Sequence, residues 1–286
     1  AFHTISNFKP IQMKIILIIA TLFLLMSCEK VVNIDLDTAP ERLVVDANIN
    51  WVKGTSGNTQ TIKLTRSTGY YQNVMPKVSN ATVTIKNSSN TIFNFIEEPS
   101  SDSNSGRYTC ENFQPVLGET YTLTIISGGK TYTATERLLP TPDIATIEQE
   151  NNLGLNNDEI GVKIKFNDFP VTNDFYLLQT IANVALLPDY QITNDQFYQG
   201  NVMSGIYTHP DLIAGSILKF RLYGISESYH NYMKLLLNAS SGSNNGPFQV
   251  TPTLVKGNIK NETDPKDLIF GYFRLGETAE YSYTIQ

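Results

Sequence analysis

Alternation of apolar and polar residues with a period of two is the feature that most constrains the fold of this chain. The first such segment places Leu43, Val45, Ala47, Ile49 and Trp51 on one side, with Arg42, Asp46, Asn48 and Asn50 on the other. Because successive side chains of a β-strand point to opposite faces, this pattern predicts a half-buried strand. The same pattern recurs in short segments at Ile62 and Leu64; Ala81, Val83 and Ile85; Phe93 and Phe95; Tyr108 and Cys110; Tyr121, Leu123 and Ile125; and Tyr132 and Ala134.

These seven segments predict a β-sandwich over residues 42–139, with either an immunoglobulin-like or a transthyretin-like topology. Gly128-Gly129 predicts a tight hairpin, because glycine reaches positive φ without a Cβ clash. Leu139-Pro140-Thr141-Pro142 predicts a linker, since proline cannot continue a central strand.

A second β-rich domain is expected over residues 140–286, so the predicted fold class is mainly β, with two tandem β-sandwich domains. Alternation at 160–167 and 218–222 predicts strands there, and the chain end predicts two more, at 270–275 and 281–285, separated by Gly276-Glu277. The stretch between Pro188 and Pro210 is rich in Asn, Gln, Tyr and Gly. It predicts a long loop or insertion, where binding functions often reside.

One helix is predicted in this second domain, near residues 226–238. Ser226 can cap its first turn, where Glu227 is also favourable. Tyr229, Tyr232, Met233 and Leu236 then recur at helical spacing. We expect this stripe to pack on the second sandwich.

Residues 1–27 predict an export signal, with translation expected to begin at Met13 and residues 1–12 lying upstream. Lys14 supplies positive charge, and the apolar run 15–26 is shorter than the roughly 20 residues that span a bilayer. The run ends in Leu25-Met26-Ser27-Cys28, which resembles the lipobox of bacterial lipoproteins. We therefore expect cleavage before Cys28, lipid on its thiol, and a lipidated tether over 28–41. An ordinary signal peptide or a simple membrane anchor is the alternative.

Charge and cysteine content narrow the function classes. Residues 1–27 hold two lysines and no acid, so their removal takes the formal net charge from −6 to −8. An acidic surface argues against nucleic-acid and anionic-lipid partners. Beside Cys28 the chain has only Cys110, so no disulfide is expected between free thiols, and Cys110 is predicted to be a core residue.

Few residues point to chemistry, and neither an enzyme nor a cofactor is expected. His209 and His230 are too far apart for a local zinc motif, and no phosphate-binding loop or nucleophile elbow is present. Asp168, Asp174 and Asp195 could contain a glycosidase pair, although solvated loops are the favoured interpretation. Calcium at Asn167-Asp168 with Asn173-Asp174, or at residues 156–159, is a weaker hypothesis because ordinary turns use the same residues; we expect no metal.

The ordered set of segments resembles a family of Bacteroidota lipoproteins, domain of unknown function 4249. The matching stretches are 42–50 (RLVVDANIN), 78–85 (VSNATVTI), 118–125 (GETYTLTI), 129–134 (GKTYTA), 257–260 (GNIK) and 271–273 (GYF). Each is a generic β motif, and their order over nearly the whole mature chain carries the resemblance. Asp46-Ala47 stands where the family commonly has Glu-Gly. The resemblance implies an outer-membrane lipoprotein, often encoded beside TonB-dependent receptors, and implies no catalytic residues.

These observations predict a non-enzymatic accessory or binding subunit, lipid-anchored in the outer membrane on either its periplasmic or its cell-surface face. Its expected partner is a TonB-dependent β-barrel receptor. The alternative is a surface glycan-binding or adhesion lipoprotein that takes a glycan or peptide. Its candidate ligand loop comprises Tyr70, Tyr71, Tyr190, Tyr198 and Tyr207, since aromatic rings offer stacking faces. Thr38, in Asp37-Thr38-Ala39, resembles an O-glycosylation acceptor of Bacteroidota.

Overall fold

The structure is a computed structural model that describes residues 40–286 apart from 70–71, 73, 100–104, 154–158 and 241–253. Pro40–Gln286 forms one compact unit. It is mainly β, as predicted, and the described residues contain a single helix. That helix is too short and too polar to span a membrane, so the described part of the chain holds no membrane-spanning helix.

The alternating segments between residues 43 and 137 form the predicted strands. Within the described residues these are β1 (Leu43–Val52), β2 (Gln60–Arg66), β3 (Thr82–Asn87), β4 (Ile92–Glu97), β5 (Arg107–Cys110), β6 (Thr120–Ser127) and β7 (Lys130–Arg137). They are ordered β1-β2-β5-β4-β3-β6-β7, and β4 pairs with both β3 and β5. The apolar faces share one core that includes Phe93, Tyr108 and Tyr121, and the predicted β-sandwich is confirmed here. Cys110 is buried in that core, as predicted.

The predicted hairpin between β6 and β7 is also confirmed. Gly128 and Gly129 have φ values of 57° and 74°, and Ser127 pairs with Lys130 across the turn. Two successive positive φ angles match the right-handed twist of the flanking strands, which explains why both turn residues are glycine.

The remaining strands are β8 (Ile144–Leu153), β9 (Glu159–Asn167), β10 (Phe175–Ala182), β11 (Asp189–Asn194), β12 (Val202–Thr208), β13 (Ile217–Ile225), β14 (Lys260–Asn261) and β15 (Phe270–Thr284). A three-stranded sheet has the order β12-β9-β8, and a second layer has the order β11-β10-β13-β15. Side chains of both layers meet in a second core around Val162, Leu178 and Phe220.

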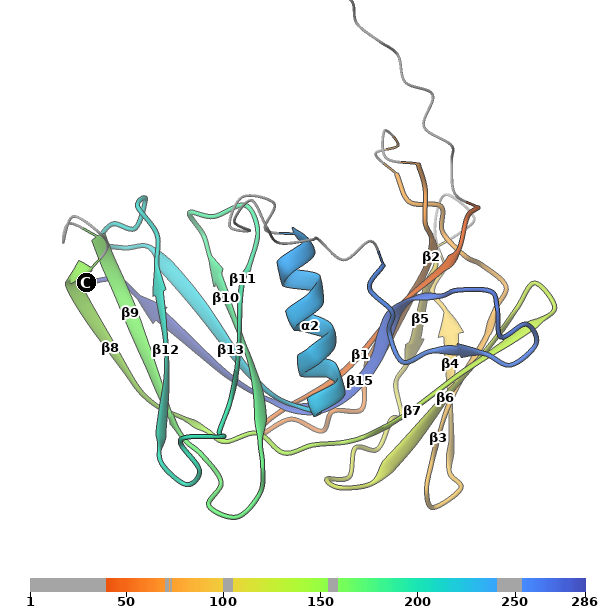
Figure 1. The fold of residues 1–286 in the computed structure, drawn as a ribbon, viewed down its shortest axis with the longest axis horizontal. Coiled ribbons are helices and arrows are strands. Elements are labelled where there is room, and N and C mark those ends of the chain that lie inside the picture. Colours follow the sequence, from red (N-terminus) through yellow and green to blue (C-terminus); the bar gives the residue numbers. More distant parts are fainter. Residues whose placement is uncertain (1–39, 70–71, 73, 100–104, 154–158, 241–253) are drawn as a thin grey trace, which may run out of the picture. The chain divides into compact units, whose positions relative to one another are not determined.

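The prediction of two strands at the chain end is wrong, because β15 runs without interruption through Gly276-Glu277. Its first part pairs in parallel with β1, from Phe270 to Thr278, and its last part pairs antiparallel with β13, as far as Thr284. Figure 1 shows β1 and β15 side by side. Because β15 hydrogen-bonds to both neighbours, it joins the two groups of strands into one sheet. The division into tandem domains at residue 140 therefore stays a prediction.

The proline-rich linker at 139–142 lies against β15. Leu139 forms an isolated bridge with Gly276, and the buried Thr141 donates its backbone N–H to Glu277 Oε2 at 3.1 Å. A Cβ on Gly224 of β13 would stand 1.9 Å from the carbonyl oxygen of Pro140. The absence of a side chain at position 224 is what lets the linker pack so closely.

The prediction of a long loop or insertion between Pro188 and Pro210 is wrong, because this stretch contains β11 and β12. Both strands lie at sheet edges, where polar residues are common. In β12 the buried positions Met203 and Tyr207 flank Gly205, whose missing side chain makes room for Leu178. The glycine removes one apolar position from the pattern and hides the alternation.

The predicted helix is confirmed as α2 (Glu227–Ser240). Ser226 caps it, because its hydroxyl accepts a hydrogen bond from Tyr229 N–H at 3.2 Å. Tyr229 and Met233 are buried in a third apolar cluster with Leu177 of β10, on the face of the sheet that the second core does not use. Leu236, expected on the same stripe, is partly exposed.

Candidate functional site: three converging aspartates

Several of the sequence-predicted sites lie outside the described residues. These are Cys28, Thr38, Tyr70 and Tyr71. Lipidation, glycosylation and the first part of the ligand loop therefore stay predictions.

The other three tyrosines of the predicted ligand loop occupy three different environments. Tyr207 is 5% exposed and belongs to the second core. Tyr190 packs beside the cluster under α2, where its hydroxyl accepts a hydrogen bond from Gln179 Nε2 at 2.7 Å. Tyr198 lies in the turn between β11 and β12 and is 54% exposed. Of these three, Tyr198 is the one whose ring is available to a ligand.

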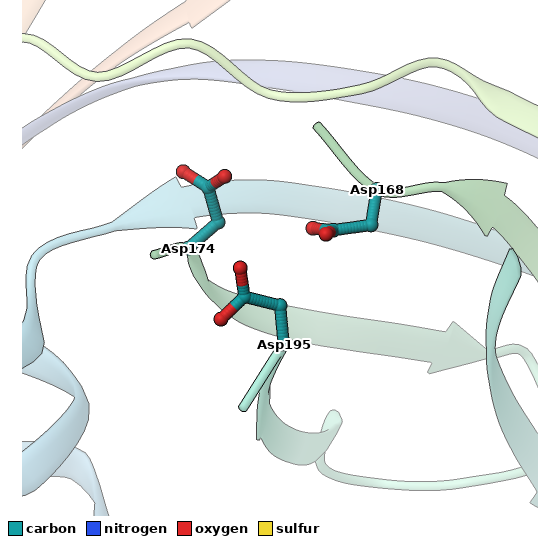
Figure 2. Close-up of side chains that lie close together, drawn as sticks. All are labelled: Asp168, Asp174 and Asp195. Atoms are coloured by element: carbon teal, nitrogen blue, oxygen red, sulfur yellow. The ribbon is translucent and has the colours of Figure 1, made fainter. Parts of the chain in front are cut away.

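Asp168, Asp174 and Asp195 come together from three separate strands (Figure 2). Asp168 follows β9, Asp174 precedes β10, and Asp195 follows β11. One carboxylate oxygen from each lies within 4.8 Å of the others. Asp168 and Asp195 are only 6% and 3% exposed, so the interpretation of these residues as solvated loop acids is wrong.

Local hydrogen bonds orient two of the carboxylates. Tyr176 donates its hydroxyl to Asp168 Oδ1 at 2.6 Å, and the backbone N–H of Gly200 donates to Asp168 Oδ2 at 2.9 Å. Thr172 donates its hydroxyl to Asp174 Oδ2 at 2.6 Å. Gly200 has a φ of +70°, and a Cβ there would approach Pro170 to 3.2 Å, so glycine permits the contact with Asp168.

The negative charge of this cluster has no cationic counterpart among the residues that the structure describes. None of the three aspartates forms an ion pair with a Lys, Arg or His of the described residues. Asp195 Oδ2 is buried and accepts no hydrogen bond from the described part of the chain. Burial raises the pKa of Asp174, the Thr172 hydrogen bond opposes that rise, and the neighbouring charges of Asp168 and Asp195 add to it. The folded chain therefore concentrates unbalanced negative charge at one point.

The geometry is unsuited to a glycosidase pair. Such a pair needs an acid and a base or nucleophile on opposite sides of a sugar ring in an open cleft. Asp168 and Asp195 are too buried to flank a sugar, and both oxygens of Asp168 already accept hydrogen bonds. A compact set of carboxylate oxygens is instead the donor type that hard cations such as Ca²⁺ prefer.

The loops that hold the aspartates also display apolar side chains. We refer to residues 168–174 and 195–201 as the paired loops. Asp168 N–H donates to Asn201 O at 3.0 Å, and Asp195 N–H donates to Asp174 O at 3.1 Å, so the loops are joined at both ends. Between these joints Val171 and Phe197 are each 82% exposed, beside the exposed Tyr198.

Neither Val171 nor Phe197 stands out in the sequence, because both lie in short stretches without the period-two alternation that marks a half-buried strand. The available signal is their position a few residues from aspartates that close neighbouring strands. That signal requires β10 and β11 to be recognised first, and neither strand shows clear alternation.

A comparison with protein families identifies the family to which the chain belongs. The model of the family described as "Domain of unknown function (DUF4249)" matches residues 29–282, which includes both groups of strands. The chain belongs to this family. No curated protein shows significant sequence similarity to this DUF4249 chain.

Solved structures similar to this DUF4249 chain are distant from it. A cytokine receptor complex is 12% identical, covers 66% of this chain and 86% of its own, and has a TM-score of 0.27. A two-domain fibronectin type-III segment of chicken tenascin is 11% identical, covers 57% and 83%, and has a TM-score of 0.21. A DUF4785 family protein from Legionella pneumophila is 11% identical, covers 64% and 52%, and has a TM-score of 0.25.

Proposed function

We propose that this DUF4249 chain is a non-enzymatic accessory or binding subunit, held on the outer membrane by lipid on Cys28 and associated with a TonB-dependent β-barrel receptor. Attachment is supported by the resemblance of residues 25–28 to a lipobox and by the tether predicted to follow them. Two or three acyl chains at about 0.8 kcal/mol per buried methylene make such an anchor effectively permanent.

The observation that carries the binding role is the apolar tip of the paired loops. Val171, Phe197 and Tyr198 are exposed on two segments that backbone hydrogen bonds join at both ends. Apolar side chains grouped on an exposed surface commonly mark interaction sites. A preformed loop also loses little conformational entropy on binding, which leaves more of the contact energy as affinity. The barrel receptor is the partner we propose for this tip.

Copurification with a matched pair of variants tests this proposal. The tagged lipoprotein is extracted in mild detergent, and any bound TonB-dependent receptor is identified by mass spectrometry. We expect wild type to recover the receptor. The double variant Phe197→Ser/Tyr198→Ser should recover at least tenfold less receptor than wild type. The control is Leu186→Ser/Leu187→Ser, because these leucines are 98% and 75% exposed but lie at the other end of the β10–β11 hairpin.

Recovery of the lipoprotein alone from every preparation would refute the association. Equal recovery by wild type and the Phe197/Tyr198 variant would show that the receptor binds elsewhere. The control variant separates the expected loss of receptor from a general effect of removing surface apolar groups.

A glycan-binding or adhesion role is the second candidate, and the exposed ring of Tyr198 favours it. An aromatic face beside an acidic cluster is a feature that a sugar could use for stacking. A glycan array should then show binding that Tyr198→Ala abolishes and Tyr190→Ala leaves unchanged. An array without signal for the wild-type protein would count against this role.

A further inference from the structure

One buried carboxylate oxygen in the three-aspartate cluster distinguishes it from a chance grouping of surface acids. Asp195 is 3% exposed, and its Oδ2 atom is buried without a hydrogen-bond donor from any residue that the structure describes. Figure 2 shows one oxygen of this carboxylate pointing toward the space between Asp168 and Asp174. Buried carboxylate oxygens are normally paired with a donor or a cation, because burial otherwise removes their hydration without compensation.

We propose that Asp168, Asp174 and Asp195 bind one Ca²⁺ ion, which fixes the paired loops in their observed arrangement. The ion would take the place of the missing donor at Asp195 Oδ2 and would balance the charge of the cluster. The site goes beyond the proposed receptor association and does not depend on it.

The separation of the oxygens agrees with the size of this ion. Ca²⁺ binds oxygen at about 2.3–2.6 Å, so two ligands of one ion lie at most about 4.6–5.2 Å apart. The observed oxygens lie within 4.8 Å of one another, which satisfies this limit for the whole set. Mg²⁺ binds at about 2.0–2.1 Å and allows at most about 4.2 Å between ligands, with near-ideal octahedral geometry. The observed separation of the carboxylate oxygens therefore suits Ca²⁺ better than Mg²⁺.

The surrounding hydrogen bonds leave the cluster able to act as a ligand set. Tyr176 donates to Asp168 Oδ1, Gly200 donates to Asp168 Oδ2, and Thr172 donates to one oxygen of Asp174. Each carboxylate oxygen has more than one acceptor position, so these contacts orient the groups without excluding a cation. Waters and backbone carbonyls commonly complete the six to eight ligands of Ca²⁺.

The consequence for the loops follows from their sequence positions. Asp168 and Asp174 are the two ends of one loop, and Asp195 begins the other. A single ion bound to all three would cross-link β9, β10 and β11 at one end of the sheets. It would also hold Val171 and Phe197 in place relative to each other.

Calorimetric titration with CaCl₂ alone tests the site. The full lipoprotein is purified in mild detergent, stripped with EDTA and exchanged into chelator-free buffer. We expect one Ca²⁺ per chain, a higher melting temperature in CaCl₂ than in EDTA, and weaker binding of MgCl₂. Asp195→Asn should weaken Ca²⁺ at least tenfold. The control Asp211→Asn changes an acid whose side chain is 75% exposed and outside the cluster, and it should bind as wild type does.

Asp174→Asn gives a second variant in which the changed side chain is less buried, and a cooperative melting transition in EDTA shows that each variant folds. Absence of both heat and a calcium-dependent melting shift in wild type would overturn the proposal. Binding that survives unchanged in both Asp195→Asn and Asp174→Asn would place the ion elsewhere and overturn it as well. Tighter binding of Mg²⁺ than of Ca²⁺ would overturn the choice of ion.

Discussion

Neutralising Asp195 should stabilise the metal-free protein. Asp195→Asn keeps the shape of the side chain, removes one of three clustered charges, and supplies an amide N–H₂ that can donate to Asp168 or Asp174. In EDTA we therefore expect the variant to unfold at a higher temperature than wild type. In saturating CaCl₂ the order should reverse, because the variant has lost a ligand that the ion needs.

The expected magnitude follows from the separations. Two unit charges 4.8 Å apart repel by about 3.5 kcal/mol at an effective dielectric constant near 20. The gain is smaller than the sum over both neighbours, because Asp174 has a raised pKa and can take up a proton to relieve the repulsion. We expect about 1–3 kcal/mol of added stability in EDTA, or roughly 3–10 °C in melting temperature for a chain of this size.

Differential scanning calorimetry in EDTA and in CaCl₂ measures both effects on the same samples. Asp211→Asn is the control, because it also removes one negative charge but lies outside the cluster. If Asp195→Asn is no more stable than Asp211→Asn in EDTA, the cluster carries no unrelieved repulsion in the folded chain and the electrostatic reasoning is refuted.

Three further predictions concern the fold. Gly224→Ala should lower the free energy of unfolding in urea by about 2–3 kcal/mol, because the new Cβ would meet Pro140 O at 1.9 Å. The control Gly54→Ala, with φ +79° and open space around the Cβ, should lower it by only about 1 kcal/mol. Equal losses in the two variants would contradict the close approach of Pro140 to Gly224. Burial raises the pKa of Glu280, but ion pairs with two basic side chains of β13 outweigh it and leave the pKa below 4.5. The contribution of Glu280 to folding stability is present above pH 4.5 and is lost as the pH falls through the lowered pKa. Glu280→Gln should therefore lower the free energy of unfolding by about 1 kcal/mol near pH 7 and leave it unchanged in strong acid. A loss of stability that does not depend on pH would contradict the ion pairing. Burial also raises the pKa of the Cys110 thiol, so Ellman's reagent should label it only in denaturant, and rapid labelling of the folded chain would contradict its place in the core.

The strands that the sequence predicts are those with one apolar face. In β1 the buried positions Val45, Ala47 and Ile49 alternate with more exposed ones, which is the pattern that period-two reasoning detects. β10 lacks that pattern because both of its faces are covered, by the second core around Leu178 and by the cluster under α2 around Leu177. The sequence of a strand that is buried on both faces is a short run of apolar residues. Such a run cannot be distinguished by its pattern from a segment of a buried helix.

The continuity of β15 could not be predicted from local sequence. Gly276 suggests a break, but β15 is held on both sides by strands from distant parts of the chain. Long-range pairing of this kind overrides the low strand propensity of glycine.

The aspartate site shows the same limit. Each aspartate, taken alone, resembles an ordinary turn residue, and nothing in the sequence selects which of the candidate acids lie close together. Their grouping depends on β9 lying in one sheet while β10 and β11 lie in the other, with the relevant strand ends adjacent. The residue types were visible in the sequence, whereas their burial and their mutual distances required the fold.

Site-specific photo-crosslinking in intact cells tests the central claim, that the tip of the paired loops binds the partner. A photoreactive phenylalanine analogue is placed at Phe197 and, in a matched strain, at Leu186, which is also strongly exposed but lies at the far end of the β10–β11 hairpin. We predict a crosslink from position 197 to a TonB-dependent receptor and none from position 186. A receptor crosslink from position 186 alone, or from neither position, would contradict the account.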